Sequence, residues 1–128
     1  MDALFDHERL EVYQLAREFN RGIQRLIEEL PSGHSETKDN LRRAAKSITR
    51  NIAEGSGRWK PADKVRFYHI ARASATESAA SLDELVDFCI LGPEQIQPHK
   101  AILSRLVGKL ISMIRSVEAR ETARSPSS

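Results

Sequence analysis

The side chains best suited to chemistry in this sequence are basic, and they gather in residues 40–58, NLRRAAKSITRNIAEGSGR. The Lys and Arg residues of this stretch are Arg42, Arg43, Lys46, Arg50 and Arg58. Guanidinium and ammonium groups bind phosphates and carboxylates through charge-assisted hydrogen bonds. The stretch therefore indicates one of two partners: a polyanion, or the acidic surface of a neighbouring subunit.

Positive charge continues beyond this stretch. Ten of the 20 Lys and Arg residues, but only three of the 18 Asp and Glu residues, lie between Lys38 and Arg72. This segment carries a formal charge of +7 and the rest of the chain −5, although the 128 residues together carry only +2. Such unevenness bears on partners rather than on fold. The candidate nucleic-acid-binding residues are Arg42, Arg43, Lys46, Arg50, Arg58, Lys60, Lys64 and Arg66.

Trp59, the only tryptophan, stands between Arg58 and Lys60. One role for it is to stack on an unpaired base of a nucleic acid. The other is to act as a lid over the end of a helix bundle, and we expect the lid. We expect Phe67 and Tyr68 to belong to the core.

Residues that would support catalysis or metal binding do not form a recognisable set. The residues three before His7, His34, His69 and His99 are not Glu, so the Glu-x-x-His pairs of di-iron bundles are missing. The segment EGSGR is not a phosphate-binding P-loop. Cys89, the only cysteine, falls on an apolar stripe and is expected to be a small buried hydrophobe. We therefore expect no enzyme activity, no cofactor and no metal site.

The elements that must position the basic residues are predicted to be helices, because apolar residues recur at helical spacing throughout. Pro31 and Gly33, Gly55, Pro61, and Gly92 with Pro93 separate four segments. We expect an N-terminal arm at 1–7, a bundle over 8–118 and a disordered tail at 119–128. The bundle helices are predicted at about 8–30, 36–54, 61–91 and 94–117, packed as an all-α, antiparallel up-and-down four-helix bundle.

The predicted second helix has a basic side that faces away from its apolar side. Stepping 100° per residue places Leu41, Ala44, Ala45, Ile48 and Ile52 on one arc. Arg42, Arg43, Lys46 and Arg50 fall on the opposite arc, with no acidic residue among them. Unrelieved like charge at this spacing is unfavourable. We therefore expect a partner outside the helix to compensate the charge.

Small residues crowd the predicted third helix in ARASATESAAS, residues 71–81, on more than one side. This pattern favours a helix buried on two faces, as in an oligomer, although Ala also suits an exposed helix. We expect Ala73, Ser74 and Glu77 to serve packing or subunit contacts, with Glu77 pairing with a basic side chain across an interface.

The single cysteine and the acidic N-terminus, without a long apolar run, favour a cytoplasmic protein without a signal peptide. No window approaches 18 uninterrupted apolar residues, so no membrane span is expected.

Three segments together resemble a known family. They are LEVYQLA at 10–16, RRAAKSITRNIAEGSGR at 42–58 and RFYHIARASATES at 66–78. In this order they are similar to the motifs of the proteins encoded in intervening sequences of bacterial 23S rRNA genes. The chain departs from the family pattern at Tyr13, where the family favours Trp, and at Ala73, where it favours Gly.

The resemblance implies an antiparallel four-helix bundle that assembles as a homopentameric ring. It also implies kinship with accessory proteins of diversity-generating retroelements, which bind nucleic acid and a reverse-transcriptase-like partner. By this similarity Arg42, Arg43, Arg50 and Arg58 match basic positions, whereas Asn51, Glu54 and Gly55 are expected to be structural. The expected function is non-enzymatic binding of RNA, DNA or a hybrid by an oligomer. The alternative is a structural or adaptor oligomer whose basic helix pairs with acidic residues of a protein partner or of a neighbouring subunit, such as Glu77, Asp83, Glu84 and Asp87.

Overall fold

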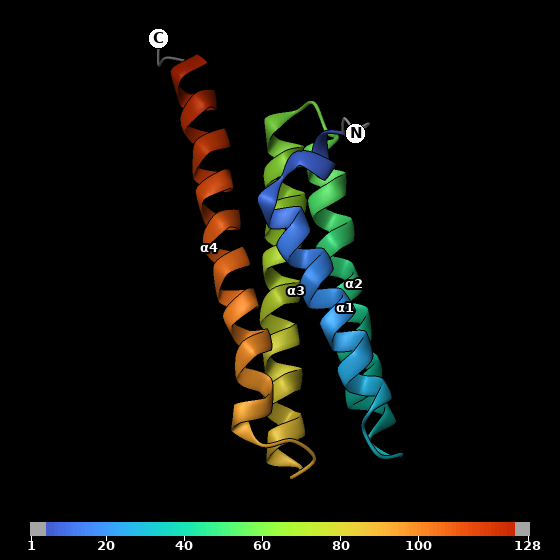
Figure 1. The fold of residues 1–128 in the computed structure, drawn as a ribbon. Coiled ribbons are helices and arrows are strands. Elements are labelled where there is room, and N and C mark those ends of the chain that lie inside the picture. Colours follow the sequence, from blue (N-terminus) through green and yellow to red (C-terminus); the bar gives the residue numbers. More distant parts are fainter. Residues whose placement is uncertain (1–4, 125–128) are drawn as a thin grey trace.

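Four long helices make up most of the protein, whose structure, a computed structural model, describes residues 5–124 apart from the side chain of Arg9. A short 3-10 helix, η1 (Asp6–Arg9), precedes α1 (Glu11–Glu28), and α2 (Ser35–Ser56), α3 (Pro61–Asp87) and α4 (Pro93–Arg124) follow. Consecutive helices run in opposite directions and pack side by side (Figure 1). This arrangement confirms the predicted all-α, up-and-down four-helix bundle.

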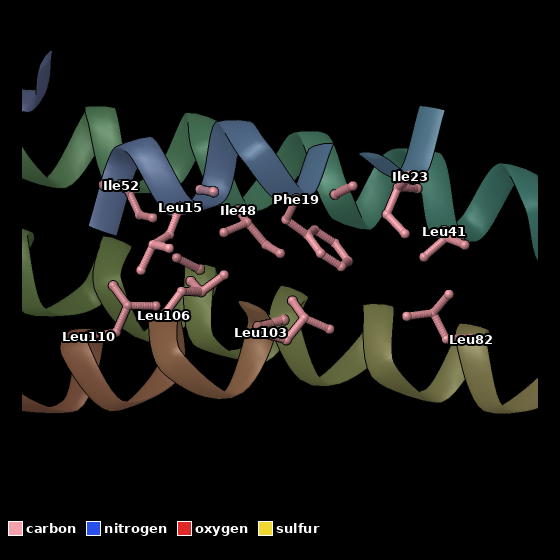
Figure 2. Close-up of a cluster of buried hydrophobic side chains, with 14 of the residues drawn as sticks. Leu15, Phe19, Ile23, Leu41, Ile48, Ile52, Leu82, Leu103, Leu106 and Leu110 are labelled. Atoms are coloured by element: carbon pink, nitrogen blue, oxygen red, sulfur yellow. The ribbon is translucent and has the colours of Figure 1, made fainter. Parts of the chain in front are cut away.

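The core lies along the bundle axis, where all four helices contribute apolar side chains (Figure 2). Its fully buried large residues include Phe19 and Ile23 from α1, Leu41, Ile48 and Ile52 from α2, Leu82 and Leu85 from α3, and Leu106 and Leu110 from α4. Each such side chain contributes roughly 1.5–3 kcal/mol by its removal from water. The predicted apolar stripes of α1, α2 and α4 are all buried or half-buried, as expected.

The end of α3 differs from the prediction because a tight turn closes the helix at Asp87 rather than near Leu91. Cys89 adopts a left-handed conformation with φ of 61°, and its N–H donates to the Val86 carbonyl at 2.9 Å. The N–H of Ile90 donates to the Leu85 carbonyl at 3.0 Å, which completes a Schellman motif. Cys89 is therefore exposed, and the prediction that it is buried is wrong, since helical periodicity stops two residues before it.

Gly55 also plays a different part from the one predicted. It does not mark the end of α2, because the helix continues to Ser56, and Gly57 follows with φ of −84°. A Cβ atom at Gly55 would lie 2.7 Å from Cε1 of Tyr68 and 2.9 Å from its Cδ1. Gly55 therefore allows α2 and α3 to approach closely next to the loop that joins them.

The far end of α4 extends beyond the core. Val117 is its last buried residue, and residues 118–124 are helical but exposed. Figure 1 shows this end of α4 projecting past the other helices, at the end of the bundle that also carries the α2–α3 loop. The prediction of disorder from residue 119 is wrong for 119–124, because the helix continues there without burying apolar surface. Residues 125–128 of the predicted tail, and 1–4 of the predicted N-terminal arm, lie outside the described residues.

No helix in the described part of the chain combines the length and the apolar character that crossing a membrane requires.

Candidate nucleic-acid interface

The basic face of α2 lies on the outside of the bundle, as its periodicity predicts. Leu41, Ala44, Ala45, Ile48 and Ile52 are buried against the other helices. Arg43, Lys46 and Arg50 are exposed, and Arg42 is half-buried. The same helix therefore anchors the bundle through one side and presents cations to solvent through the other.

Part of this basic face has carboxylate partners within the chain, which corrects the expectation that the face lacks them. Arg42 pairs with Asp39 at 3.2 Å, one turn before it on α2. Arg43 lies 3.8 Å from Glu77 of α3 and also donates to the Asn40 side chain at 2.8 Å. Glu77 thus pairs within the chain, whereas the sequence predicted a pair across an interface. Ion pairs as exposed as these contribute about 0–1 kcal/mol and exchange partners readily.

Lys46 and Arg50 differ from their neighbours. Across residues 5–124, neither side chain has a carboxylate within ion-pairing distance. They are four residues apart, so they lie one above the other on the same exposed face. These two cations form the uncompensated centre of the basic face.

Farther along α2, the same row reaches the α2–α3 loop through Glu54 and Arg58. Arg58 pairs with Glu54 at 3.1 Å, and its guanidinium carbon also lies 4.8 Å from the centroid of the Phe67 ring. Arg66 approaches the same ring at 4.7 Å. Two guanidinium groups thus gather on one half-buried aromatic ring, with one carboxylate partner between them. Stacking on the ring holds both groups in place while leaving their N–H groups available to an anion.

Lys64 is placed differently from the other candidate residues. Its ammonium group donates to the carbonyl oxygens of Gly55 at 3.2 Å and Ser56 at 2.9 Å. These carbonyls belong to the last turn of α2, where they have no N–H donor within the helix, and that of Gly55 also accepts from the Arg58 N–H at 3.2 Å. Burial lowers the pKa of Lys64, Asp6 raises it and Arg120 lowers it. Lys64 therefore closes the end of α2 and ties it to α3, whereas Lys60 is exposed.

Trp59 is 96% exposed, so the expectation that it forms a lid over the bundle is wrong for the single chain. Tyr68, in contrast, is buried as expected, and burial raises its pKa. Phe67 is half-buried and lies beneath the two arginines. The sequence alone could not show which of the three aromatic side chains is exposed, half-buried or buried, since all three lie within residues 59–68.

Polar residues behind the basic face join α2 to α3. The Asn51 amide donates to the Ser47 carbonyl at 2.8 Å and to its hydroxyl at 3.0 Å. The Ser47 hydroxyl in turn lies 2.8 Å from that of Ser74 on α3, which is buried. In the single chain, Asn51 and Ser74 therefore take part in the hydrogen bonds between α2 and α3. Ala73 is exposed, so in the single chain α3 is not buried on the side that carries it.

Sequence reasoning missed the contribution of α4 to this end of the molecule. A hollow of about 340 Å³ next to the α2–α3 loop is lined by residues from α4 as well as from the loop and α3. They are Trp59, Pro61, Lys64, Val117, Arg120, Glu121, Ala123 and Arg124. Arg120 and Arg124 are spaced as helical neighbours, but they lie in a segment expected to be disordered. Within the described residues, no group of three or more His, Cys, Asp or Glu is placed to hold a metal ion.

Comparison with known proteins identifies the family to which the chain belongs. Residues 8–112 match the family model described as 23S rRNA-intervening sequence protein. The chain belongs to this family. Its fold is similar to the crystal structure of a protein of unknown function from the S23 ribosomal protein family of Bacteroides thetaiotaomicron. The TM-score is 0.74 at 24% sequence identity, over 81% of this chain and 95% of the other. A search of curated proteins found no match.

Membership of the 23S rRNA-intervening sequence protein family confirms the resemblance seen in the three sequence segments. All three segments lie within the matched residues 8–112. The match ends before Arg120 and Arg124, so the α4 side of the hollow lies outside the shared region.

Proposed function

We propose that this family member is a non-enzymatic, oligomeric accessory protein that binds RNA or an RNA–DNA hybrid through the outer face of α2. The observation that supports the proposal most directly is the pair Lys46 and Arg50, exposed one turn apart without a carboxylate partner in the described chain. Arg42, Arg43 and Arg58 extend the same surface, and their exposed carboxylate partners are readily displaced by phosphates. Lys60 and Arg66 continue it onto the loop and α3.

Contacts of this kind would provide affinity with little base specificity. Lys and Arg at phosphates position a nucleic acid, whereas base edges carry the sequence information. Each neutralised phosphate releases counterions, so binding weakens as salt concentration rises. A strong salt dependence is therefore the signature of the proposed surface.

The first prediction concerns reversal of the two unpaired cations. Lys46→Glu combined with Arg50→Glu should weaken binding to a fluorescein-labelled 20-base-pair RNA–DNA hybrid in fluorescence anisotropy. If each side chain neutralises one phosphate, the log–log salt slope should become shallower by roughly 1.8, taking the duplex value of about 0.9 per phosphate. Titrations at four salt concentrations measure the slope.

The matched control is Arg17→Glu combined with Arg21→Glu. These residues are also exposed and four apart, but they lie on α1, and their reversal changes the net charge equally. The control should lose less affinity and keep the parental slope. Equal losses in both double variants would show that only overall charge matters, and salt-independent binding would overturn the proposal.

The assembly into a ring of five copies, implied by the family resemblance, stays a prediction, as do a reverse-transcriptase-like partner and a cytoplasmic location. The second candidate function is a structural or adaptor oligomer. It is favoured by the outer side of α3, where Ile70, Ala73 and Ala80 are exposed. The small side chains of Ala73 and Ala80 would let a second helix pack closely, and Ile70 would provide apolar surface beside them.

Three of the four residues in the acidic strip that this second candidate requires have partners within the chain, although the exposed ion pairs among them are as easily displaced as those of the basic face. Glu77 pairs with Arg43, Asp83 with Lys100 at 2.9 Å, and Glu84 accepts a hydrogen bond from Thr37 at 3.1 Å. If the α2 face nevertheless pairs with another subunit, the Lys46→Glu and Arg50→Glu variant should dissociate the oligomer. Light scattering separates the two functions, because the binding proposal expects an unchanged mass.

A further inference from the structure

The exposed indole of Trp59 stands on a loop that is fixed at both ends. On the α2 side, the Gly57 and Arg58 N–H groups donate to carbonyls of the last turn at 3.2 Å each. On the α3 side, Pro61 begins the next helix and Lys64 bonds back to α2. The loop is short, running from Gly57 to Lys60. Trp59 is therefore held in solvent by an anchored backbone.

The surroundings of Trp59 combine apolar surface with positive charge. Pro61, Val117 and Ala123 contribute the apolar part of the adjoining hollow, and Arg120 and Arg124 contribute cations against the single carboxylate of Glu121, while the ammonium group of Lys64 is bonded to carbonyls of α2. Its volume of about 340 Å³ is at the lower end of the roughly 300–1,000 Å³ typical of ligand pockets. A flat apolar group that carries negative charge beside it suits this site.

Arg58, which precedes Trp59 in the sequence, lies at the end of the basic face of α2. Lys46, Arg50 and Glu54 form one row of α2 at four-residue spacing, and Arg58, in the loop just after the helix, pairs with Glu54 at the end of that row. Arg58 and Arg66 both stack on Phe67, so their positions are defined before any ligand binds. Arg58 and Trp59 line separate hollows next to the α2–α3 loop, so a strand with phosphates along this row would cross the loop to bring its next nucleotide to Trp59.

We propose that Trp59 stacks on an unpaired base of the bound nucleic acid, so that the protein prefers single-stranded extensions or junctions to blunt duplex. This inference rests on the proposed function and adds the class of substrate to it. Every base has a π-face, so stacking on Trp59 is tolerant of sequence. The cations around the indole also disfavour a symmetric contact with a second copy, which would place like charges opposite one another.

The experiment compares two labelled probes: a blunt 20-base-pair RNA–DNA hybrid, and the same hybrid with a single-stranded extension of five uridines. The parent protein should bind the extended probe more tightly. Trp59→Ala should weaken binding of the extended probe by roughly 5- to 150-fold, the range expected for loss of one stacked base, and leave the blunt probe unchanged. Trp59→Phe, which keeps a smaller ring, should recover part of the loss.

Phe88→Ala is the matched control, because Phe88 is another exposed aromatic residue, at 48%, and it lies at the end of α3 away from the α2–α3 loop. It should keep the preference for the extended probe. Fluorescence adds a direct readout, since Trp59 is the only tryptophan. The extended probe should quench its emission, whereas the blunt probe should not. Circular dichroism of each variant verifies that the bundle remains folded.

The outcomes separate this inference from the proposed function. Salt-dependent binding of both probes, with no preference and no quenching, would overturn the role of Trp59 and leave the phosphate-binding face standing. Binding of neither probe would overturn both. Protection of the indole from acrylamide in the free protein would show that another copy covers Trp59, and would also overturn the inference.

Discussion

At the scale of single residues, contacts between side chains and backbone decide how α2 and α3 meet beside the candidate interface. Gly55 leaves room for the Tyr68 ring, and Lys64 occupies the carbonyl oxygens at the end of α2. Asn51, Ser47 and Ser74 form a hydrogen-bonded row between the same helices. The cations on the outside of α2 are therefore carried by a closely fitted helix pair.

The close packing of α2 against α3 at Gly55 leads to a prediction about the stability of the bundle. Gly55→Ala should destabilise the bundle by roughly 1–3 kcal/mol, because the new methyl group would overlap the Tyr68 ring and force the helices apart. Gly57→Ala is the control, since a Cβ there would meet only backbone oxygens at 3.6 and 3.8 Å. Denaturant unfolding of both variants measures the difference. Equal free energies of unfolding would show that the helix pair adjusts without cost.

At the scale of elements, the ends of the helices are where the sequence is least informative. The apolar spacing correctly predicted the inner faces of α1, α2 and α4, since burial repeats with the helical period. It did not reveal the end of α3, because Cys89 takes a conformation that Gly usually provides. Nor did it reveal that α4 continues past Val117, since exposed helix and unstructured tail share a polar composition.

The left-handed residue at the end of α3 leads to a prediction of increased stability. Cys89→Gly should raise the free energy of unfolding by about 1 kcal/mol, because a side chain disfavours the left-handed conformation by roughly 1–2 kcal/mol. Cys89→Ala also removes the thiol but retains a Cβ atom, so it should leave the stability close to that of the parent. Thermal melts of the three proteins provide the comparison. A stabilised alanine variant would point to the thiol rather than to the backbone.

At the scale of the whole molecule, contacts between residues far apart in the sequence determine which basic side chains of α2 are paired with a carboxylate and which are not. Arg43 and Glu77 are separated by 34 positions but meet across α2 and α3. The sequence alone could predict the basic face but could not assign this pair, since it does not give the relative rotation of two helices. The exposure of Trp59 was unpredictable for a similar reason, because it depends on where the ends of three helices lie.

The stability of the bundle as a whole should depend on pH through His99. This histidine lies on α4 against Gly22 of α1, and burial lowers its pKa from the ordinary value of 6.5. The unfolded chain therefore takes up this proton more readily than the folded one, and stability falls as pH drops below about 6.5. His99→Gln should reduce the fall in melting temperature between pH 7 and pH 5. The exposed His69→Gln variant serves as the control, and an unchanged pH dependence in His99→Gln would exclude His99 as the cause.

The overhanging end of α4 has an evolutionary consequence. Residues 118–124 bury no core side chain, and they lie beyond the stretch shared with the family. Because these side chains are exposed, substitutions there would incur almost no folding penalty. Changes at Arg120 or Arg124 would alter the rim around Trp59 while the bundle stayed intact. New ligand preferences could thus arise on an inherited scaffold through mutations that selection for stability does not remove.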